Sequence, residues 1–180
     1  LVGKHGKTTA RFQISAKYRL FTPPSDRAAT FGENFYFAYT QTSLWDLQSE
    51  SKPFVDTTFN PSIFWLSENI WSSDDQQWRA GLNVGAEHAS NGKDKEDSRS
   101  INDFYLKPAL SYSFDDGSAL TFSPKIKSYF GVEYTNHDYF DYAGRVDWNL
   151  RWAQNNGAVV SAMYRQGRDQ RRTSQVDFAW

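Results

Sequence analysis

Residues 10–20 read ARFQISAKYRL, and they alternate without interruption between two kinds of side chain. The even positions carry Ala, Phe, Ile, Ala, Tyr and Leu, and the odd positions carry Arg, Gln, Ser, Lys and Arg. Successive side chains of a β-strand point to opposite faces, so this period of two predicts a strand with one apolar and one polar face.

The same alternation recurs in four more segments, which are 78–90, 103–114, 120–127 and 140–152. It is weaker in two segments near the end of the chain, 158–165 and 173–180, and less clean in two aromatic-rich segments, 35–47 and 59–71. Asn-Gly or Asp-Gly steps at 91–92, 115–117 and 155–157 predict tight turns. We therefore expect about nine strands, no helical segment and an antiparallel meander.

Composition narrows the class of protein. The 180 residues include 7 Trp, 10 Tyr, 14 Phe and no Cys, which excludes a disulfide scaffold and argues against disorder. The net charge of −1 gives no general case for binding nucleic acid. The mean hydropathy is −0.71, and no stretch approaches the roughly 20 apolar residues of a membrane-spanning helix.

Two kinds of barrel fit this pattern: a transmembrane antiparallel up-and-down β-barrel, whose apolar face meets lipid, and a soluble lipocalin-like barrel, whose apolar face points inward. Periodicity alone does not separate them. Trp and Tyr near the predicted strand ends favour the transmembrane barrel, because amphipathic rings prefer headgroup depth. These residues are Trp45, Trp71, Trp78, Tyr112 and Trp152. The loops 48–53 and 91–99 are long and polar, and the loop 91–99 is then expected on the exterior side.

Three polar residues interrupt the apolar face. His88 and Ser90 continue that face of the 78–90 segment, and Asn102 lies on the apolar face of the next one. In a symmetric hairpin Asn102 is opposite His88 and Ser100 is opposite Ser90. Serine, imidazole and an orienting amide can act as nucleophile, base and orienter. From spacing alone, ordinary polar side chains at a barrel rim remain the simpler interpretation.

The motifs His88-Ala89-Ser90-Asn91-Gly92 and Ser98-Arg99-Ser100-Ile101-Asn102 closely resemble the outer membrane phospholipase A family, calcium-dependent barrel enzymes of Gram-negative bacteria. The resemblance is specific from about residue 10 to residue 108. It implies that Ser90 is the nucleophile, His88 the proton acceptor and Asn102 the residue that orients His88.

The resemblance also implies a Ca²⁺ site that is completed in a homodimer. Its ligands would be the backbone carbonyl of Lys93, the hydroxyl of Ser98 and, from the partner protomer, Ser51. Oxygen ligands of this kind suit Ca²⁺. Glu96, Asp97 and Glu133 are candidate additional ligands, although loop carboxylates are more often simply solvated.

The family has twelve strands, and the alternation at 176–180 ends in mid-pattern. We therefore expect one barrel domain over residues 1–180 that lacks one or more C-terminal strands, with a smaller barrel as the alternative. The implied function is hydrolysis of phospholipids and lysophospholipids in the Gram-negative outer membrane. A non-catalytic outer-membrane channel or structural barrel is the alternative function.

Overall fold

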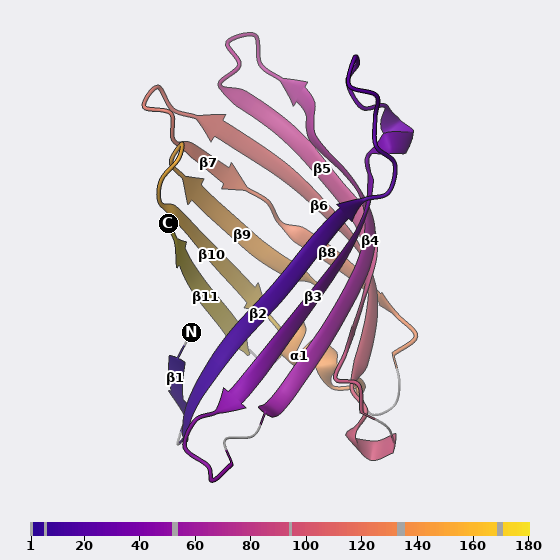
Figure 1. The fold of residues 1–180 in the computed structure, drawn as a ribbon, viewed down its shortest axis with the longest axis vertical. Helices are drawn as coiled ribbons and strands as arrows, with labels where there is room; N and C mark the ends of the chain where they lie inside the picture. The colour runs from indigo at the N-terminus through magenta and orange to yellow at the C-terminus, as the bar shows by residue number, and fades with distance from the viewer. Residues whose placement is uncertain (1, 6, 52–53, 94, 133–135, 169–170) are drawn as a thin grey trace. The chain divides into compact units, whose positions relative to one another are not determined.

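The computed structural model describes residues 1–180 except residues 1, 6, 52–53, 94, 133–135 and 169–170. Within that part of the chain, eleven strands form one sheet, in the order β1 to β7, then β9, β10 and β11, with β8 paired to β6 and β9 (Figure 1). The strands are β1 (Val2–His5), β2 (Lys7–Arg19), β3 (Phe35–Asp46), β4 (Phe54–Ser72), β5 (Trp78–Ser90), β6 (Ser100–Ser113), β7 (Ala119–Phe122), β8 (Lys125–Phe130), β9 (Val146–Ala153), β10 (Val159–Gln166) and β11 (Arg172–Ala179).

The strand count exceeds the expected nine for two reasons. β1 was not predicted, and the segment 120–127 is divided between β7 and β8. The division falls at Ser123 and Pro124, and proline has no N–H to donate to a sheet ladder. The strand order otherwise follows the chain, as expected for an antiparallel meander.

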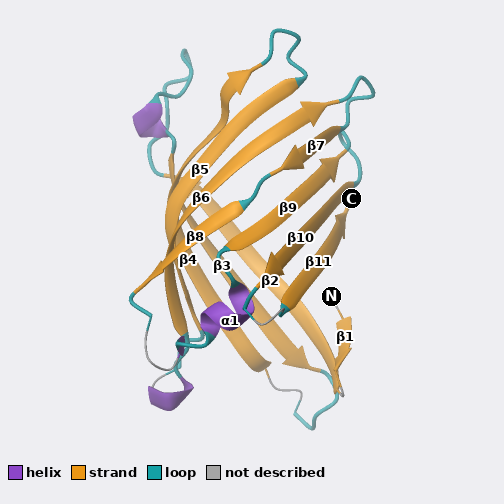
Figure 2. Ribbon diagram, turned by 180° about the vertical axis from the view of Figure 1, so that it is seen from behind, coloured by secondary structure: helices purple, strands orange, loops and turns teal. Residues whose placement is uncertain are grey.

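The prediction of no helical segment was wrong. The part of the chain that the structure describes contains three short helical pieces among the strands: the 3-10 helices η1 (Phe31–Glu33) and η2 (Lys95–Asp97), and the α-helix α1 (Tyr139–Ala143), drawn in purple in Figure 2. α1 replaces the start of the strand expected from residue 140. It ends at Ala143 and is followed by Gly144, whose φ of 58° is the left-handed conformation that commonly closes helices. None of the described helices is long and apolar enough to cross a membrane.

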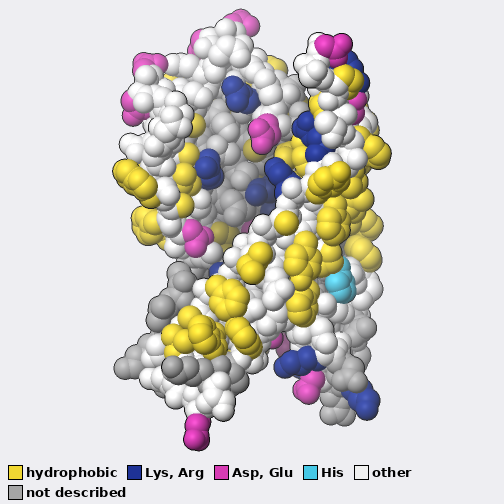
Figure 3. All heavy atoms as spheres, in the orientation of Figure 1, with side chains coloured by type: hydrophobic (Ala, Val, Ile, Leu, Met, Phe, Trp, Pro, Cys, Tyr) yellow, Lys and Arg dark blue, Asp and Glu magenta, His cyan; other side chains and the backbone are white. Residues whose placement is uncertain are grey.

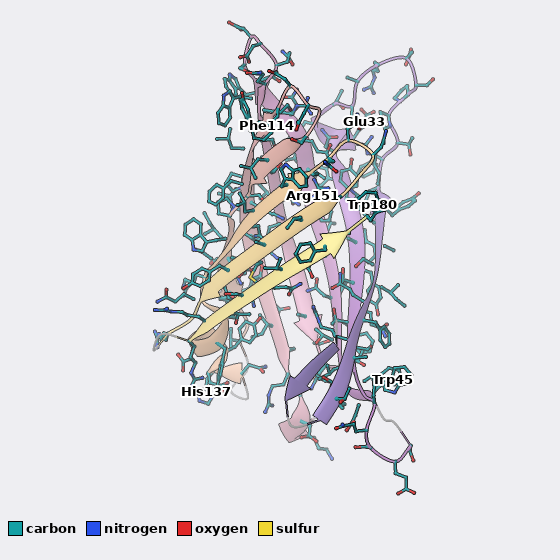
Figure 4. The ribbon with its side chains drawn as sticks, turned by 90° about the vertical axis from the view of Figure 1, so that its left-hand side faces the viewer. Glu33, Trp45, Phe114, His137, Arg151 and Trp180 are labelled. Carbon is teal, nitrogen blue, oxygen red and sulfur yellow. The ribbon has the colours of Figure 1, made fainter. Side chains whose placement is uncertain are left out.

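Contacts divide the chain into two compact units, and the first contains Leu1–Ile63, Ala86–Asp103 and Tyr129–Asn136. In this unit β2 pairs antiparallel with β3, from Thr9 opposite Asp46 to Arg19 opposite Tyr36. Figure 4 places Glu33 and Trp45 at opposite ends of β3. The Trp45 ring stacks on Phe54 at a centroid distance of 5.9 Å.

The second unit contains Phe64–Gly85, Phe104–Ser128 and His137–Trp180. β9 is its central strand and pairs with β7 and β8 on one edge and with β10 on the other. Figure 4 places Phe114 and His137 at opposite ends of these strands. The expectation of a single domain over residues 1–180 stays a prediction.

Burial within each unit is the reverse of that in a soluble domain. In the first unit Asp103 is 4% exposed, whereas Ile14 is 64% exposed. In the second unit Lys127 is 5% exposed, whereas Leu150 is 45% exposed. Figure 3 shows hydrophobic side chains gathered along β2 and β3. Charged residues are almost never fully buried unless paired, so this distribution is typical of strands with an inner polar face and an outer apolar face.

Candidate functional site

The three predicted catalytic residues lie on the hairpin formed by β5 and β6, in the first unit. The Asn91 N–H donates to the Arg99 carbonyl oxygen at 3.0 Å, which closes the hairpin around the loop 91–99. This pairing has the symmetry expected from the sequence, because it places Asn102 across from His88. Ser90 is the last residue of β5, and Asn102 is the third residue of β6.

Asn102 lies on the outer face of β6. Its neighbours Ile101 and Asp103 are buried, whereas Phe104, two residues along from Asn102, is 58% exposed. Because side chains two positions apart share a face of a strand, Asn102 shares the apolar outer face with Phe104. A polar residue in this position has no evident packing role.

His88 and Asn102 are hydrogen-bonded. His88 Nδ1 lies 2.8 Å from Asn102 Oδ1, and both side chains are half-buried. An amide oxygen only accepts, so this bond requires the neutral imidazole to carry its proton on Nδ1. Nε2 then holds the lone pair, and it makes no hydrogen bond to another described residue. The arrangement leaves Nε2 able to accept a proton.

Ser90 lies two residues along β5 from His88 and therefore on the same face. Its side chain is also half-buried. Within the described part of the chain, no hydrogen bond joins the Ser90 hydroxyl to His88. Catalytic hydrogen bonds are often long or poorly aligned before substrate binds, so the structure brings the pair onto one face without showing the bond.

Two asparagines that the sequence reasoning missed support the backbone of this hairpin. Asn60 Nδ2 donates to the His88 carbonyl oxygen at 3.1 Å, and Asn136 Nδ2 donates to the Ser100 carbonyl oxygen at 2.8 Å. Asn60 precedes Pro61, which has no N–H for the sheet ladder. A proline in the interior of a strand is the signal that could have pointed to Asn60. The proline cannot donate an N–H to a backbone carbonyl oxygen of the neighbouring strand, and a side chain beside the proline can donate to it instead.

The predicted metal ligands lie in loops of the same unit. Lys93 and Ser51 are exposed and Ser98 is half-buried. Neither the Lys93 carbonyl oxygen nor the Ser98 hydroxyl is hydrogen-bonded to another described residue. Among the described residues, no group of three or more His, Cys, Asp or Glu could hold a metal. Glu133 and the side chain of Glu96 lie outside the described residues.

A shallow groove of about 260 Å³ adjoins His88 and Asn102. Its other walls are mostly apolar and are Phe37, Pro61, Ser62, Ile63, Ala86, Glu87 and Phe130. All of these residues belong to the first unit. The hairpin therefore combines a polarised histidine with an adjacent surface that suits a hydrocarbon chain.

The fold is shared with solved structures. The Salmonella typhi outer membrane phospholipase, a dimer with bound calcium, is similar with a TM-score of 0.76 and 23% identity over 96% of this chain and 65% of that chain. The Escherichia coli outer membrane phospholipase A gives a TM-score of 0.76 and 22% identity over 96% of this chain and 69% of that chain. These likenesses confirm the predicted fold class, an all-β antiparallel up-and-down barrel fold.

Sequence comparison agrees with the fold. A Neisseria meningitidis serogroup B protein named "Putative phospholipase A1" is 27% identical over 171 residues, which cover 91% of this chain and 42% of that protein. The chain thus spans less than half the length of that curated relative. The Phospholipase A1 family model matches residues 2–180. The chain therefore belongs to the phospholipase A1 family.

Proposed function

We propose that this chain hydrolyses acyl esters of phospholipids and lysophospholipids in the Gram-negative outer membrane, with Ser90, His88 and Asn102 as its catalytic triad. The observation that carries the proposal is the 2.8 Å contact between His88 Nδ1 and Asn102 Oδ1 on a face that is otherwise apolar. An active-site mutant of the Escherichia coli protein, in which alanine replaces an asparagine, has the same fold at a TM-score of 0.75. This is consistent with a role for an asparagine in such a site.

In the proposed mechanism, Ser90 Oγ attacks the ester carbonyl carbon while its proton passes to His88 Nε2. The Asn102 oxygen accepts a hydrogen bond from the Nδ1–H of His88 and so keeps the imidazole in the required tautomer and orientation. The imidazolium then protonates the departing lysophospholipid or glycerol oxygen, which leaves an acyl-serine ester. A water molecule attacks that ester, His88 again accepts and returns the proton, and the fatty acid leaves with Ser90 regenerated.

The position of the site suits a membrane-embedded substrate. The exposed apolar residues around Asn102 would face lipid in a transmembrane barrel, and phospholipid could enter sideways without leaving the bilayer. The groove beside His88 would accommodate part of an acyl chain. We also propose that the two compact units form one barrel domain, since β4, β5 and β6 contribute residues to both.

Calcium and dimerisation belong to the same proposal. The oxygens of Lys93 and Ser98 are hard ligands of the kind that Ca²⁺ prefers, and neither is engaged elsewhere in the described structure. Ser51 of the partner protomer would supply a further hydroxyl. When bound, Ca²⁺ would stabilise negative charge on the reacting ester oxygen, an effect for which one well-placed group typically contributes about 10²–10³ in rate.

The test is phospholipid hydrolysis by detergent-solubilised protein, with and without a calcium chelator. Ser90→Ala should reduce the rate by at least about 10³, because the nucleophile is lost. Ser100→Ala is the matched control, since Ser100 lies on the same face of the same hairpin, and its rate should stay within about twofold of the wild type. Hydrolysis by folded Ser90→Ala at the wild-type rate would contradict the proposal. Ion conductance without hydrolysis would favour a channel instead.

A further inference from the structure

Asn91, between the proposed nucleophile and Gly92, makes three side-chain hydrogen bonds within its loop. Its Nδ2 donates to the Asp97 carbonyl oxygen at 2.8 Å. Its Oδ1 accepts from the Lys93 N–H at 3.3 Å and from the Arg99 N–H at 3.0 Å. One side chain therefore hydrogen-bonds the backbone at three places in the loop 91–99, which are Lys93, Asp97 and Arg99.

Only an amide side chain can make this set of contacts. It combines two N–H donors with an oxygen that has two acceptor positions. An ionised aspartate could accept from both backbone N–H groups but could not donate to the Asp97 carbonyl, and alanine could do neither. The variants Asn91→Asp and Asn91→Ala therefore remove one and three of the side-chain hydrogen bonds, respectively.

The neighbouring residues restrict the path of the chain at the same point. Gly92 has a φ of 66°, a conformation that residues with a Cβ rarely adopt. A Cβ added there would lie 2.9 Å from the Phe59 ring. The backbone conformation with which the loop leaves β5 is therefore sterically restricted. The hydrogen bonds of the Asn91 side chain then hold the later residues of the loop close to its first residues.

We propose that Asn91 is a positioning residue that fixes the Lys93 carbonyl and the Ser98 hydroxyl relative to Ser90, so that the calcium affinity of the loop depends on it. This inference rests on the calcium part of the proposed function. The Lys93 N–H is bound by the Asn91 oxygen, and Ser98 lies between the two residues whose backbone Asn91 holds, Asp97 and Arg99. Ordering an exposed loop costs conformational entropy, and a ligand set held in advance requires less ordering when the ion binds.

The first measurement is calcium binding itself, by isothermal titration calorimetry on folded protein in detergent. Asn91→Ala should raise the dissociation constant for calcium by about tenfold or more, the range seen when groups that orient metal ligands are removed. Asn91→Asp should fall between Asn91→Ala and the wild type. Asn155→Ala changes an asparagine in a turn of the second unit and should bind calcium as the wild type does.

The second measurement is hydrogen exchange without calcium. The amides of Lys93 and Arg99 should exchange faster in Asn91→Ala, while amides within β5 keep their protection. Hydrolysis at saturating calcium should recover to near the wild-type rate, which a variant with a generally damaged site would not do.

The outcomes separate the two proposals. A wild type that binds calcium, together with an Asn91→Ala of unchanged calcium affinity and loop exchange, overturns the role of Asn91 alone. A wild type that binds no calcium overturns the metal part of the proposed function and this inference with it. Retained heat-modifiable migration in gels confirms that each variant is folded before either measurement.

Discussion

Two polar groupings, one in each compact unit, differ in their surroundings and in their partners. On the outer face of the β5–β6 hairpin, His88 and Asn102 form a single hydrogen bond among apolar neighbours. On β8, β9 and β10, the carboxylate of Asp147 lies 2.8 Å from Lys127 Nζ and 2.9 Å from Arg165 Nε. The pair of His88 and Asn102 is half-buried and carries no charge when the imidazole is neutral. The second grouping is charged, and its Lys127 and Asp147 are buried.

The difference separates structure from function. Buried charges must be paired, and the group around Asp147 is what strands with a polar inner face require to remain folded. Nothing comparable requires an imidazole and an amide on the outer face, where apolar residues would be solvated better by lipid. We therefore expect substitutions in the charged group to change stability, and substitutions in the hairpin to change the reaction.

The largest effect on stability is expected for Asp147→Asn. Removing the carboxylate takes a counter-charge from the buried ammonium of Lys127 and the half-buried guanidinium of Arg165, which typically costs about 3 kcal/mol or more. The free energy of unfolding, measured by urea titration in lipid vesicles, should fall by that amount. Asp177→Asn, at an exposed position of β11, is the control and should change it little. Equal stability of the two variants would mean that the inner face is too hydrated for the charges to matter.

Asn102→Ala should have the converse effect. Loss of the hydrogen bond to His88 removes the group that orients the imidazole and stabilises its protonated form, which corresponds to about 10- to 100-fold in kcat. The free energy of unfolding should change little. The carboxylate of Asn102→Asp can still accept a hydrogen bond from the His88 Nδ1–H, so this variant should recover much of the rate. If the variant lost stability and kept its rate, the hydrogen bond between His88 and Asn102 would have a structural role, like the charged group around Asp147.

Asn60→Ala should have a smaller effect on the reaction. It leaves the His88 carbonyl without its side-chain donor, and one neutral hydrogen bond typically contributes about 1 kcal/mol, so kcat should fall about fivefold with KM nearly unchanged. The measurement is the kcat and KM of hydrolysis on mixed micelles. A rise in KM alone would indicate that Asn60 acts on the groove.

The smallest effect concerns an exposed ion pair. Arg27 donates to Glu33 at 2.6 Å and holds the pKa of that carboxyl at about 2, below the ordinary 4.5, with a further contribution from the Thr30 N–H. Because the folded pKa is lowered, the order that this carboxylate gives to the loop is present above about pH 4.5 and is lost as the pH falls towards 2. Carbon-13 NMR should show a Glu33 titration midpoint near 2 that moves towards 4.5 in Arg27→Gln. An unshifted midpoint in the wild type would show that the pair does not form in solution.

Local patterns made much of the fold and part of the site predictable from sequence. Alternation identified the outer face of β6, and the symmetry of one hairpin was enough to place Asn102 across from His88. Both depend only on residues close together in the chain. The start expected at residue 140 for the strand that became β9 was wrong, because Gly144 closes a short helix there and the strand begins only at Val146.

Features that depend on distant strands were not predictable. Lys127 and Asp147 lie in two of the segments for which alternation predicted strands, but pairing them requires the register of β8 against β9, where Lys125 lies opposite Asp147. Asn60 acts on His88 from 28 residues away along the chain. The role of Asn91 depends on the path of a loop, which no periodicity describes.

The proposed hydrolysis depends first of all on Ser90 being a nucleophile that His88 activates. The most direct test is reaction with an alkyl sulfonyl fluoride, which forms a sulfonate ester with an activated serine and releases fluoride, followed by mass spectrometry of the digested protein. We expect one adduct per chain, on Ser90, that is lost in His88→Ala and greatly slowed in Asn102→Ala. Labelling of Ser90 at the same rate in His88→Ala, or no labelling of the folded wild type, would contradict it.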